Sequence, residues 1–288
     1  MNLALPAGGA IIQAMDDQTQ AHCLDGAVRA AHLAGAGLAG HFGKLSHSHV
    51  SSKSSPVDLV SIADRESEEV LREELRLILP GAGFIGEESS GAAVITDCDL
   101  AWVVDPLDGT SNYLAGLPIW SISIALCSLD FTPLLGVVHA PPLGKTWTAI
   151  RGKGAYANGE LMHVRAEPPG SGLDNAMLAT GFPYDVSLGR SNSTIAYYSK
   201  MQARFQKIRR LGSAAIDMAY VAEGIFDGMW ESRLREWDTA AGVLLVTEAG
   251  GYCEQLNGNP YIPGSADMLV AATPHLLAMM RSVLATEV

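Results

Sequence analysis

Several signals that would place this chain in a specialised class are missing from its sequence. Its 288 residues include only four cysteines, Cys23, Cys98, Cys127 and Cys253, which lie far apart and form no CxxC pair. This usage predicts buried free thiols in a reducing compartment rather than a disulfide framework. The N-terminus has no basic start followed by an apolar core, and no apolar run approaches the roughly 18 residues of a membrane span. We therefore expect a soluble, cytoplasmic protein.

Basic residues are also scarce. Lys and Arg number 19 against 31 Asp and Glu, so the formal net charge is −12. This balance argues against nucleic-acid binding through a broad basic surface. An anionic substrate would instead be bound by local features such as metal ions, backbone N–H groups or a few arginines.

The histidines do not form a zinc motif. His41, His47 and His49 gather in a Ser/His-rich stretch over 41–55, but no HExxH or Cys/His spacing surrounds them. This stretch is predicted to be a loop.

The hydrophobic pattern predicts a mixed α and β chain, long enough for one large domain or two smaller ones. Helices are predicted over 21–42, 64–79, 191–205, 214–223 and 238–249, and strands near 84–86, 102–104, 120–126, 134–139, 146–150 and 208–211. Residues 1–20 are predicted to form a flexible extension. The Pro/Gly-rich stretch over 165–175 is the expected boundary between an N-terminal α+β half (21–170) and a C-terminal α/β half (171–288).

The most informative segment is Asp105-Pro-Leu-Asp-Gly-Thr110, which follows the apolar run 101–104. Two acids at the end of a buried strand repel each other and are costly to desolvate, and a divalent cation removes that cost. Pro106 predicts that the strand ends near Asp105. A helix beginning near Thr110 would offer N–H groups to an anion. The segment therefore predicts a metal site that acts on a phosphate, against the simpler interpretation of an Asp/Gly-rich surface turn.

Two further acidic clusters fit the same chemistry. Glu87 and Glu88 follow an apolar strand and a glycine, where they form either a solvated loop or a metal ligand with a hydrogen-bonding neighbour. Asp238 lies at a predicted helix start, where it either caps the helix or reaches a metal. With Asp64 as another candidate, this many carboxylates fits two or more Mg²⁺ ions.

Four segments of the chain, between about Lys53 and Gly251, resemble the inositol monophosphatase family of Mg²⁺-dependent, lithium-sensitive phosphomonoesterases. The matching segments are Asp105-Pro-Leu-Asp-Gly-Thr-Ser-Asn-Tyr113, Gly86-Glu-Glu-Ser89, Trp237-Asp-Thr-Ala-Ala-Gly242 and Lys53-Ser-Ser-Pro-Val-Asp-Leu-Val60. Asp64 falls at the additional acid of that family. The resemblance implies a layered αβαβα sandwich, of the inositol monophosphatase and fructose-1,6-bisphosphatase type, with the site between the two halves.

The resemblance also implies roles for individual residues. Glu87, Asp105 and the Leu107 carbonyl would hold a first metal ion, and Asp105, Asp108 and Asp238 a second. Glu87, with Asp64 through water, would help to hold a third. Thr110 and Glu87 would orient the nucleophilic water.

On the substrate side, Asp108, Gly109, Thr110, Ser111 and Asp238 would adjoin the phosphate. Ser213 and Ala214 match a family segment on the substrate side, and Glu231 falls where a glutamate binds ring hydroxyls. The alternative for Glu231 is a surface acid beside Arg233 and Arg235, whose own roles stay open.

The expected function is Mg²⁺-dependent hydrolysis of a small phosphate monoester by metal-activated water, with myo-inositol 1-phosphate as the first candidate. Histidinol phosphate or another sugar phosphate is the alternative. A haloacid-dehalogenase-type phosphatase is disfavoured because two residues, not one, separate Asp105 from Asp108. A catalytically dead scaffold would have lost a ligand, and a carboxylate-pair glycosidase leaves the Gly-Thr segment unexplained. The exposed edges of such a fold commonly pair, so a homodimer is expected. The acidic charge and the absence of long apolar runs predict no nucleic-acid or membrane partner.

Overall fold

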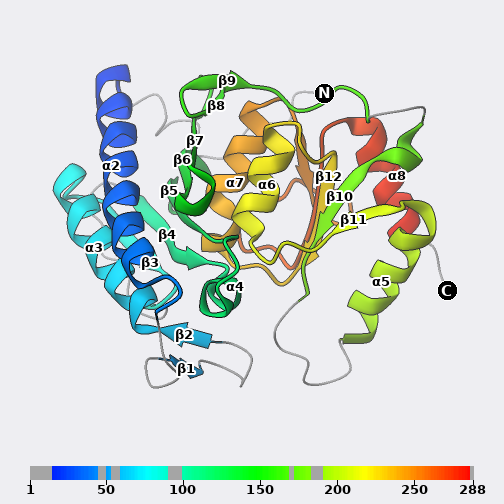
Figure 1. The fold of residues 1–288 in the computed structure, drawn as a ribbon. Coiled ribbons are helices and arrows are strands. Elements are labelled where there is room, and N and C mark those ends of the chain that lie inside the picture. Colours follow the sequence, from blue (N-terminus) through cyan, green and yellow to red (C-terminus); the bar gives the residue numbers. More distant parts are fainter. Residues whose placement is uncertain are drawn as a thin grey trace.

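Two β-sheets alternate with three layers of helices (Figure 1). The computed structural model describes residues 15–44, 50–52, 59–89, 99–168, 172–182 and 191–285. Helices α2 and α3 cover the outer face of a seven-stranded sheet, and α6 and α7 lie between that sheet and a five-stranded sheet. Helices α5 and α8 cover the far side of the second sheet. The αβαβα sandwich expected from the family resemblance is therefore confirmed.

The seven-stranded sheet is a meander apart from its first pair, since β3 runs parallel to β4 and every later pair is antiparallel. In order across the sheet, its strands are β3 (Gly83–Gly86), β4 (Leu100–Asp108), β5 (Ser121–Ser128), β6 (Pro133–Ala140), β7 (Lys145–Ile150), β8 (Ala155–Ala157) and β9 (Glu160–Met162). All residues of β4 and β5 are buried. Because helices cover both faces of this sheet, its central strands are apolar runs rather than alternating ones.

The outer helices pack closely on this sheet and on each other. Helix α2 (Asp17–His41) begins where the Asp16 carboxylate accepts a hydrogen bond from Thr19 N at 2.7 Å, so residues 17–20 are helical instead of part of a flexible extension. Its glycines allow close approach: a Cβ at Gly35 would lie 2.9 Å from the His139 ring. Helix α3 (Ile62–Ile78) ends before Pro80.

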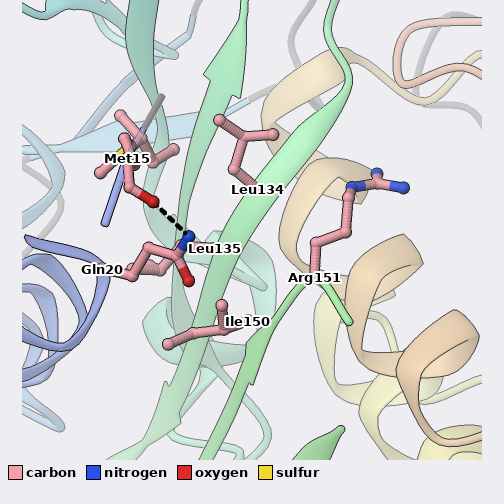
Figure 2. Close-up of a pocket in the computed structure, with 7 residues that line it drawn as sticks. Met15, Gln20, Leu134, Leu135, Ile150 and Arg151 are labelled. Carbon is pink, nitrogen blue, oxygen red and sulfur yellow. Dashed lines mark hydrogen bonds between the residues drawn. The ribbon is translucent and has the colours of Figure 1, made fainter. Parts of the chain in front are cut away.

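A small, mainly apolar pocket lies where the chain enters α2 (Figure 2). Leu134, Leu135 and Ile150 of the sheet form part of its wall, and Gln20 Nε2 donates to Met15 O at 2.9 Å. The pocket belongs to the packing of the N-terminal helix on the sheet.

Small residues allow the inner helices α6 (Ala214–Ala222) and α7 (Glu236–Glu248) to fit between the sheets. A Cβ at Gly136 of β6 would lie 3.1 Å from the Ala241 backbone, and one at Gly242 would lie 2.5 Å from Met218. One apolar core joins residues of the first sheet, both inner helices and the second sheet. The two halves of the chain therefore share a core.

The second sheet has the order β11 (Lys207–Arg209), β10 (Met177–Thr180), β12 (Gly228–Ser232), β14 (Asp267–Ala271) and β13 (Tyr252–Glu254). Strands β10, β11 and β12 are parallel, while β14 is antiparallel to β12 and β13. Helices α5 (Ser191–Arg204) and α8 (Pro274–Ala285) pack on it. The hydrophobic pattern did not predict β12, β13, β14 or α8.

The remaining elements are short. Strands β1 (Val50–Ser52) and β2 (Leu59–Ser61) form an antiparallel pair, and 3-10 helices span Pro141–Leu143 and Leu173–Asn175. Residues 53–58 of the segment that resembles the family's N-terminal motif lie outside the described residues, as do Cys98, His47 and His49. Cys23 and Cys127 are buried free thiols and Cys253 is a half-buried one. In the described part of the chain, no helix is both long and apolar enough to cross a membrane.

Candidate active site

A β-bulge at the end of β4 places Asp105 and Asp108 on the same side of the sheet. The strand continues past Pro106 to Asp108, so the prediction that it ends near Asp105 is wrong. Asp105 pairs with Ser123 and Asp108 with Ser121, and the register shifts between them. In a regular strand, the side chains of residues three apart point to opposite faces of the sheet. The bulge adds one residue between Asp105 and Asp108, so both side chains point to the same face.

The bulge is held by its own hydrogen bonds. Asp105 Oδ1 accepts from Leu107 N at 2.9 Å, and Ser67 Oγ of α3 donates to Pro106 O at 2.8 Å. Gly109 then turns the chain with φ +93°, and a Cβ there would lie 2.9 Å from Ile119 O. The short helix α4 (Thr110–Ala115) follows, with Ser111 half-buried in its first turn.

The Thr110 hydroxyl links the bulge to α3. It lies 3.0 Å from Asp64 Oδ1 and 3.1 Å from Leu107 O, and it can donate its one proton to either acceptor. Asp64 is buried in the first turn of α3. Because the proton of Thr110 is directed at protein acceptors, its lone pairs are left to accept a hydrogen bond from another group.

Glu87 follows β3, which is parallel to β4, so the carboxyl ends of both strands lie at the same edge of the sheet. Glu87 N donates to Val104 O at 3.2 Å. The next residue is held by Glu68 of α3, whose Oε2 accepts from Glu88 N at 2.8 Å while Oε1 accepts from Arg72 at 2.7 Å. Sequence reasoning missed Glu68, because a Glu–Arg pair four residues apart is common on exposed helix faces.

Asp108 is bound to the start of α6. Its Oδ2 accepts hydrogen bonds from Ser213 Oγ at 2.5 Å and from Ala215 N at 2.8 Å. Ser213 is also the N-cap of α6, where its Oγ accepts from Ile216 N at 3.4 Å, and Ala214 is the first residue of the helix. The predicted residues Ser213 and Ala214 therefore lie beside the acidic bulge.

Asp238 lies in the first turn of α7, two residues after the helix begins at Glu236. Its Oδ2 accepts from Arg235 N at 2.7 Å, so it satisfies the backbone of the N-cap residue without being the N-cap itself. The Arg235 guanidinium lies over the Trp237 ring at 5.7 Å.

These carboxylates act on one another electrostatically. Burial raises the pKa of Asp105 well above its usual range, and the negative charges of Glu87, Asp108 and Asp238 raise it further. Burial also raises the pKa of Asp108 to about 6, although the Ser213 and Ala215 hydrogen bonds lower it. The pKa of Asp238 is raised by burial and then by the charge of Glu87. The structure thus brings four of the predicted acids close enough to act on one another.

This donor set has the chemistry that hard divalent cations prefer, because it consists of carboxylates and a strand-end carbonyl. Among the described residues, however, no three His, Cys, Asp or Glu side chains are grouped so that they could hold one ion as they stand. Asp108 and Asp238 each direct one oxygen to hydroxyl or backbone donors. The residues fit a metal site by the type of their oxygen ligands and by the mutual repulsion of their charges.

Next to the acids is a pocket that opens to solvent. Asp108, Asp238 and Ser213 line it, together with Glu231 at the end of β12, Asp217 of α6 and Arg210. Burial and the charge of Asp108 raise the pKa of Glu231 to about 8, while Arg210 lowers it. Glu231 thus lines a pocket and is not a surface acid. Asp217 and Arg210 line the same pocket, and the sequence patterns did not single them out.

Of the three histidines considered in the sequence, only His41 is among the described residues. His41 Nε2 contacts Glu66 Oε2 at 3.0 Å at the exposed end of α2.

The fold and the site together define a class: layered αβαβα proteins with an acidic cleft between the two sheets. The model of the inositol monophosphatase family matches residues 19–287, and the chain belongs to that family. It is 40% identical over 259 residues to an inositol-1-monophosphatase of Rhizobium meliloti, covering 89% of this chain and 94% of that protein. It is also 39% identical over 256 residues to a protein named Nus factor SuhB from Salmonella typhimurium, covering 88% and 92%.

Solved structures agree with this assignment. The extragenic suppressor protein suhB of Bartonella henselae superposes with a TM-score of 0.82 at 34% identity, covering 92% of this chain and 99% of that one. The Thermotoga maritima IMPase superposes with a TM-score of 0.78 at 31% identity, covering 91% and 97%. The family is one of metal-dependent enzymes, and the chain is a phosphatase.

Proposed function

We propose that this chain hydrolyses small phosphate monoesters with Mg²⁺, and that its substrate is a phosphorylated polyol such as myo-inositol 1-phosphate. The observation that carries the proposal is the position of the Glu231 pocket directly beside Asp108 and Asp238. The leaving group of a phosphate held at the acidic bulge would therefore lie against hydrogen-bonding side chains. The names of the relatives support the same activity.

The proposed metal ligands are Glu87, Asp105, the Leu107 carbonyl, Asp108 and Asp238, with Asp64 as a further acid. Burial and then the charges of the neighbouring acids raise the pKa values of Asp105 and Asp238, and bound cations would offset both effects. Two or three Mg²⁺ ions would supply charge neutralisation of the phosphate and activation of water.

The proposed role of Thr110 is to orient the attacking water. Its hydroxyl donates to Asp64 or Leu107 O, so an incoming water can donate to Thr110 Oγ. Glu87, from the neighbouring strand end, is the proposed second acceptor of that water. Two fixed hydrogen-bond acceptors would hold the water in one orientation, so that its oxygen points at the phosphorus atom. Holding a reactant in the geometry of attack lowers the barrier to reaction.

On the substrate side, we propose that Gly109, Thr110 and Ser111 adjoin the phosphate, because Gly109 turns the chain directly after the bulge. Ser213, Ala214 and Glu231 adjoin the leaving group. Lithium inhibition, a cytoplasmic location, a homodimer and the absence of nucleic-acid binding remain predictions.

A panel of phosphomonoesters assayed at fixed Mg²⁺ tests the proposal. We expect kcat/KM for myo-inositol 1-phosphate to exceed that for histidinol phosphate and fructose 1,6-bisphosphate. A higher value for histidinol phosphate would transfer the assignment to that substrate. Trapping of a phosphorylated Asp105 during turnover would contradict direct attack by water.

A further inference from the structure

Asp217 is a second acid, besides Glu231, in the pocket that adjoins Asp108 and Asp238. It lies in the first turn of α6 and is 1% exposed, while every other residue of this helix except Tyr220 is apolar and buried. Both Asp217 and Glu231 line the pocket.

The Asp217 carboxyl group lacks a full set of partners inside the protein. Its Oδ1 is buried and has no hydrogen-bond partner among the described residues. A buried polar oxygen without a partner is destabilising, and a methionine or alanine at this position would avoid that cost. An acid that is kept in an apolar helix and also lines a pocket therefore suggests a partner that enters through the pocket.

The charges around the pocket restrict what that partner can be. Glu231 and Asp108 act on Asp217 electrostatically, and both are acids. Arg210, the cation that acts on Glu231, lies over the Phe182 ring with its Cζ 4.8 Å from the centroid. A leaving group with a second phosphate or a carboxylate would face two acids, whereas one with several hydroxyl groups would meet hydrogen-bonding partners.

The Glu231 carboxylate lies against the backbone at the end of β10, the strand next to β12. Gly181, which follows β10, lies so close that a Cβ there would overlap Glu231 Oε1. The Glu231 carboxylate is therefore packed against the Gly181 backbone, and the pocket presents two acids from two different elements, α6 and β12.

We propose that Asp217 is a specificity-determining residue whose carboxyl group, which lines the pocket beside Glu231, hydrogen-bonds a hydroxyl group of the leaving group. The substrate class is a phosphate ester of a polyhydroxylated alcohol with hydroxyl groups spaced to reach both acids. This inference rests on the proposed phosphatase function and adds to it the side chain that distinguishes a polyol from an apolar alcohol. A site built to bond a hydroxyl discriminates strongly against an analogue that lacks it.

The test compares myo-inositol 1-phosphate with cyclohexyl phosphate, which has the same six-membered carbon ring without the hydroxyl groups. The ratio of kcat/KM for the two esters is measured in the wild type, Asp217→Leu and Asp217→Asn. We expect Asp217→Leu to lower the ratio by about tenfold or more, mainly through a higher KM for the inositol ester. Asp217→Asn, which keeps a hydrogen-bonding group of the same shape, should restore part of the ratio.

Glu223→Gln is the matched control, because Glu223 caps the other end of α6 and its carboxylate binds Lys145 and Trp147 outside the pocket. The control should leave the ratio unchanged. A ratio in Asp217→Leu within twofold of the wild type would overturn the inference while leaving the phosphatase function intact.

A second measurement does not need turnover. We expect calorimetry to detect myo-inositol binding to the wild type in the presence of Mg²⁺ and inorganic phosphate, and binding to weaken in Asp217→Leu. If inositol binding weakens in Asp217→Leu but the wild type hydrolyses neither ester, the role of Asp217 is upheld and the proposed phosphatase function is refuted. Equal inositol binding by both proteins would overturn the inference.

Discussion

Thr110 shows how one side chain can connect the two parts of the proposed reaction centre. Its hydroxyl bridges Asp64 of α3 and the Leu107 carbonyl of the bulge. Both acceptors belong to the proposed metal site, and the residue is otherwise part of the first turn of α4. A hydroxyl held in this way has its acceptor side fixed in direction, which is what orientation of a water requires.

Replacement of Thr110 by valine should therefore lower kcat by about 10²-fold or more, because the side chain keeps its shape but loses the hydroxyl. Thr110→Ser should retain most of the activity. Steady-state kinetics of both variants with the same ester provide the measurement. Equal kcat values for the valine variant and the wild type would exclude the proposed role in water orientation.

The acids of the bulge could be predicted from sequence because a local turn fixes them. Asp105 and Asp108 end the apolar strand β4 and Glu87 follows β3, so their positions depend on a few neighbouring residues. Asp217 depends on the packing of α6 against distant strands, and sequence reasoning did not single it out. One signal was present, since an acid in the run Ala-Ala-Ile-Asp-Met-Ala is unusual in a buried helix.

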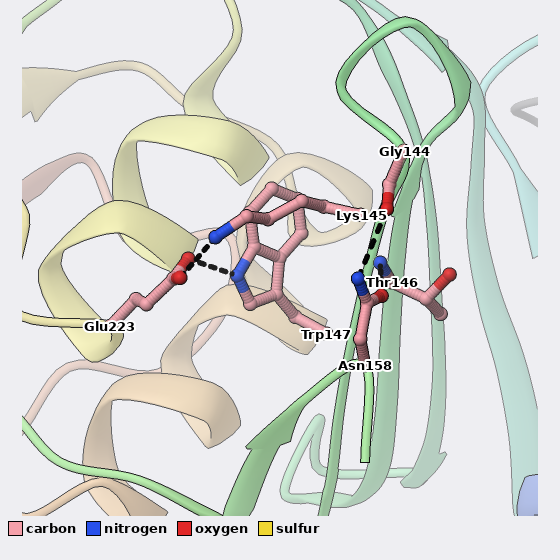
Figure 3. A network of polar contacts seen from close by, with 6 residues as sticks. All are labelled: Gly144, Lys145, Thr146, Trp147, Asn158 and Glu223. Atoms are coloured by element: carbon pink, nitrogen blue, oxygen red, sulfur yellow. Dashed lines mark hydrogen bonds and ion pairs between the residues drawn. The ribbon is translucent and has the colours of Figure 1, made fainter. Parts of the chain in front are cut away.

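At the scale of elements, polar contacts fix how the inner helices lie on the first sheet. Glu223, the C-cap residue of α6, accepts a hydrogen bond from Trp147 Nε1 at 2.8 Å and pairs with Lys145 (Figure 3). Asn158 holds the same strand from its other side, accepting from Thr146 N at 2.9 Å and donating to Gly144 O at 3.0 Å. The end of α6 is thus attached to the start of β7.

Glu223→Ala should destabilise the protein by about 1–3 kcal/mol, because the buried indole N–H loses its acceptor. Urea unfolding followed by tryptophan fluorescence measures the change. Glu223→Gln, which keeps an acceptor for Trp147, should cost less. If the alanine variant is as stable as the wild type, the contact does not anchor the helix.

The packing of α2 on β6 predicts a pH dependence of stability. His139 of β6 packs against His32 of α2 with ring centroids 4.4 Å apart and the ring planes tilted by 45°. Thr146 Oγ1 contacts both rings, at 2.9 Å from His139 and 3.1 Å from His32. Burial, and then the nearby His32, lower the pKa of His139 to about 4 from an ordinary 6.5. Between these values the unfolded chain binds a proton that the folded chain does not, so stability falls as pH falls from about 6.5 to 4.

Unfolding free energies at pH 7.5, 6 and 5 test this expectation. The loss of stability over this range should be smaller in His139→Gln than in the wild type. His41→Gln, at the exposed end of the same helix, is the control and should lose stability as the wild type does. The same pH dependence in all three proteins would show that His139 does not contribute.

At the scale of the whole molecule, the site depends on both halves of the chain. Asp105 and Asp108 belong to β4 of the first sheet and Glu87 directly follows β3, whereas Asp238 comes from α7, which packs between the two sheets. Asn112 of α4 reinforces the junction, since its Nδ2 donates to Ile119 O and to Leu211 O, both at 2.8 Å. The expected boundary near 165–175 falls between β9 and β10, but it does not separate two independent cores.

Periodicity predicted the long elements and family resemblance predicted the layers, for different physical reasons. Helix α3 and strands β4 to β7 have strong local patterns, so their positions could be inferred directly. Strand β12 has five residues and includes a glycine and Glu231, and it exists because β10 and β14 pair with it from distant parts of the chain. Local patterns do not contain that information.

Calorimetric titration of Mg²⁺ into the protein tests the central claim most directly, namely that the acids of the cleft form a divalent-cation site. Asp108→Asn is the informative variant, because asparagine can still accept from Ser213 and Ala215 but has no charge. We predict Mg²⁺ binding by the wild type and by the Glu223→Gln control, and binding at least about tenfold weaker in Asp108→Asn. No binding by the wild type at millimolar Mg²⁺, or equal binding by Asp108→Asn, would contradict the account.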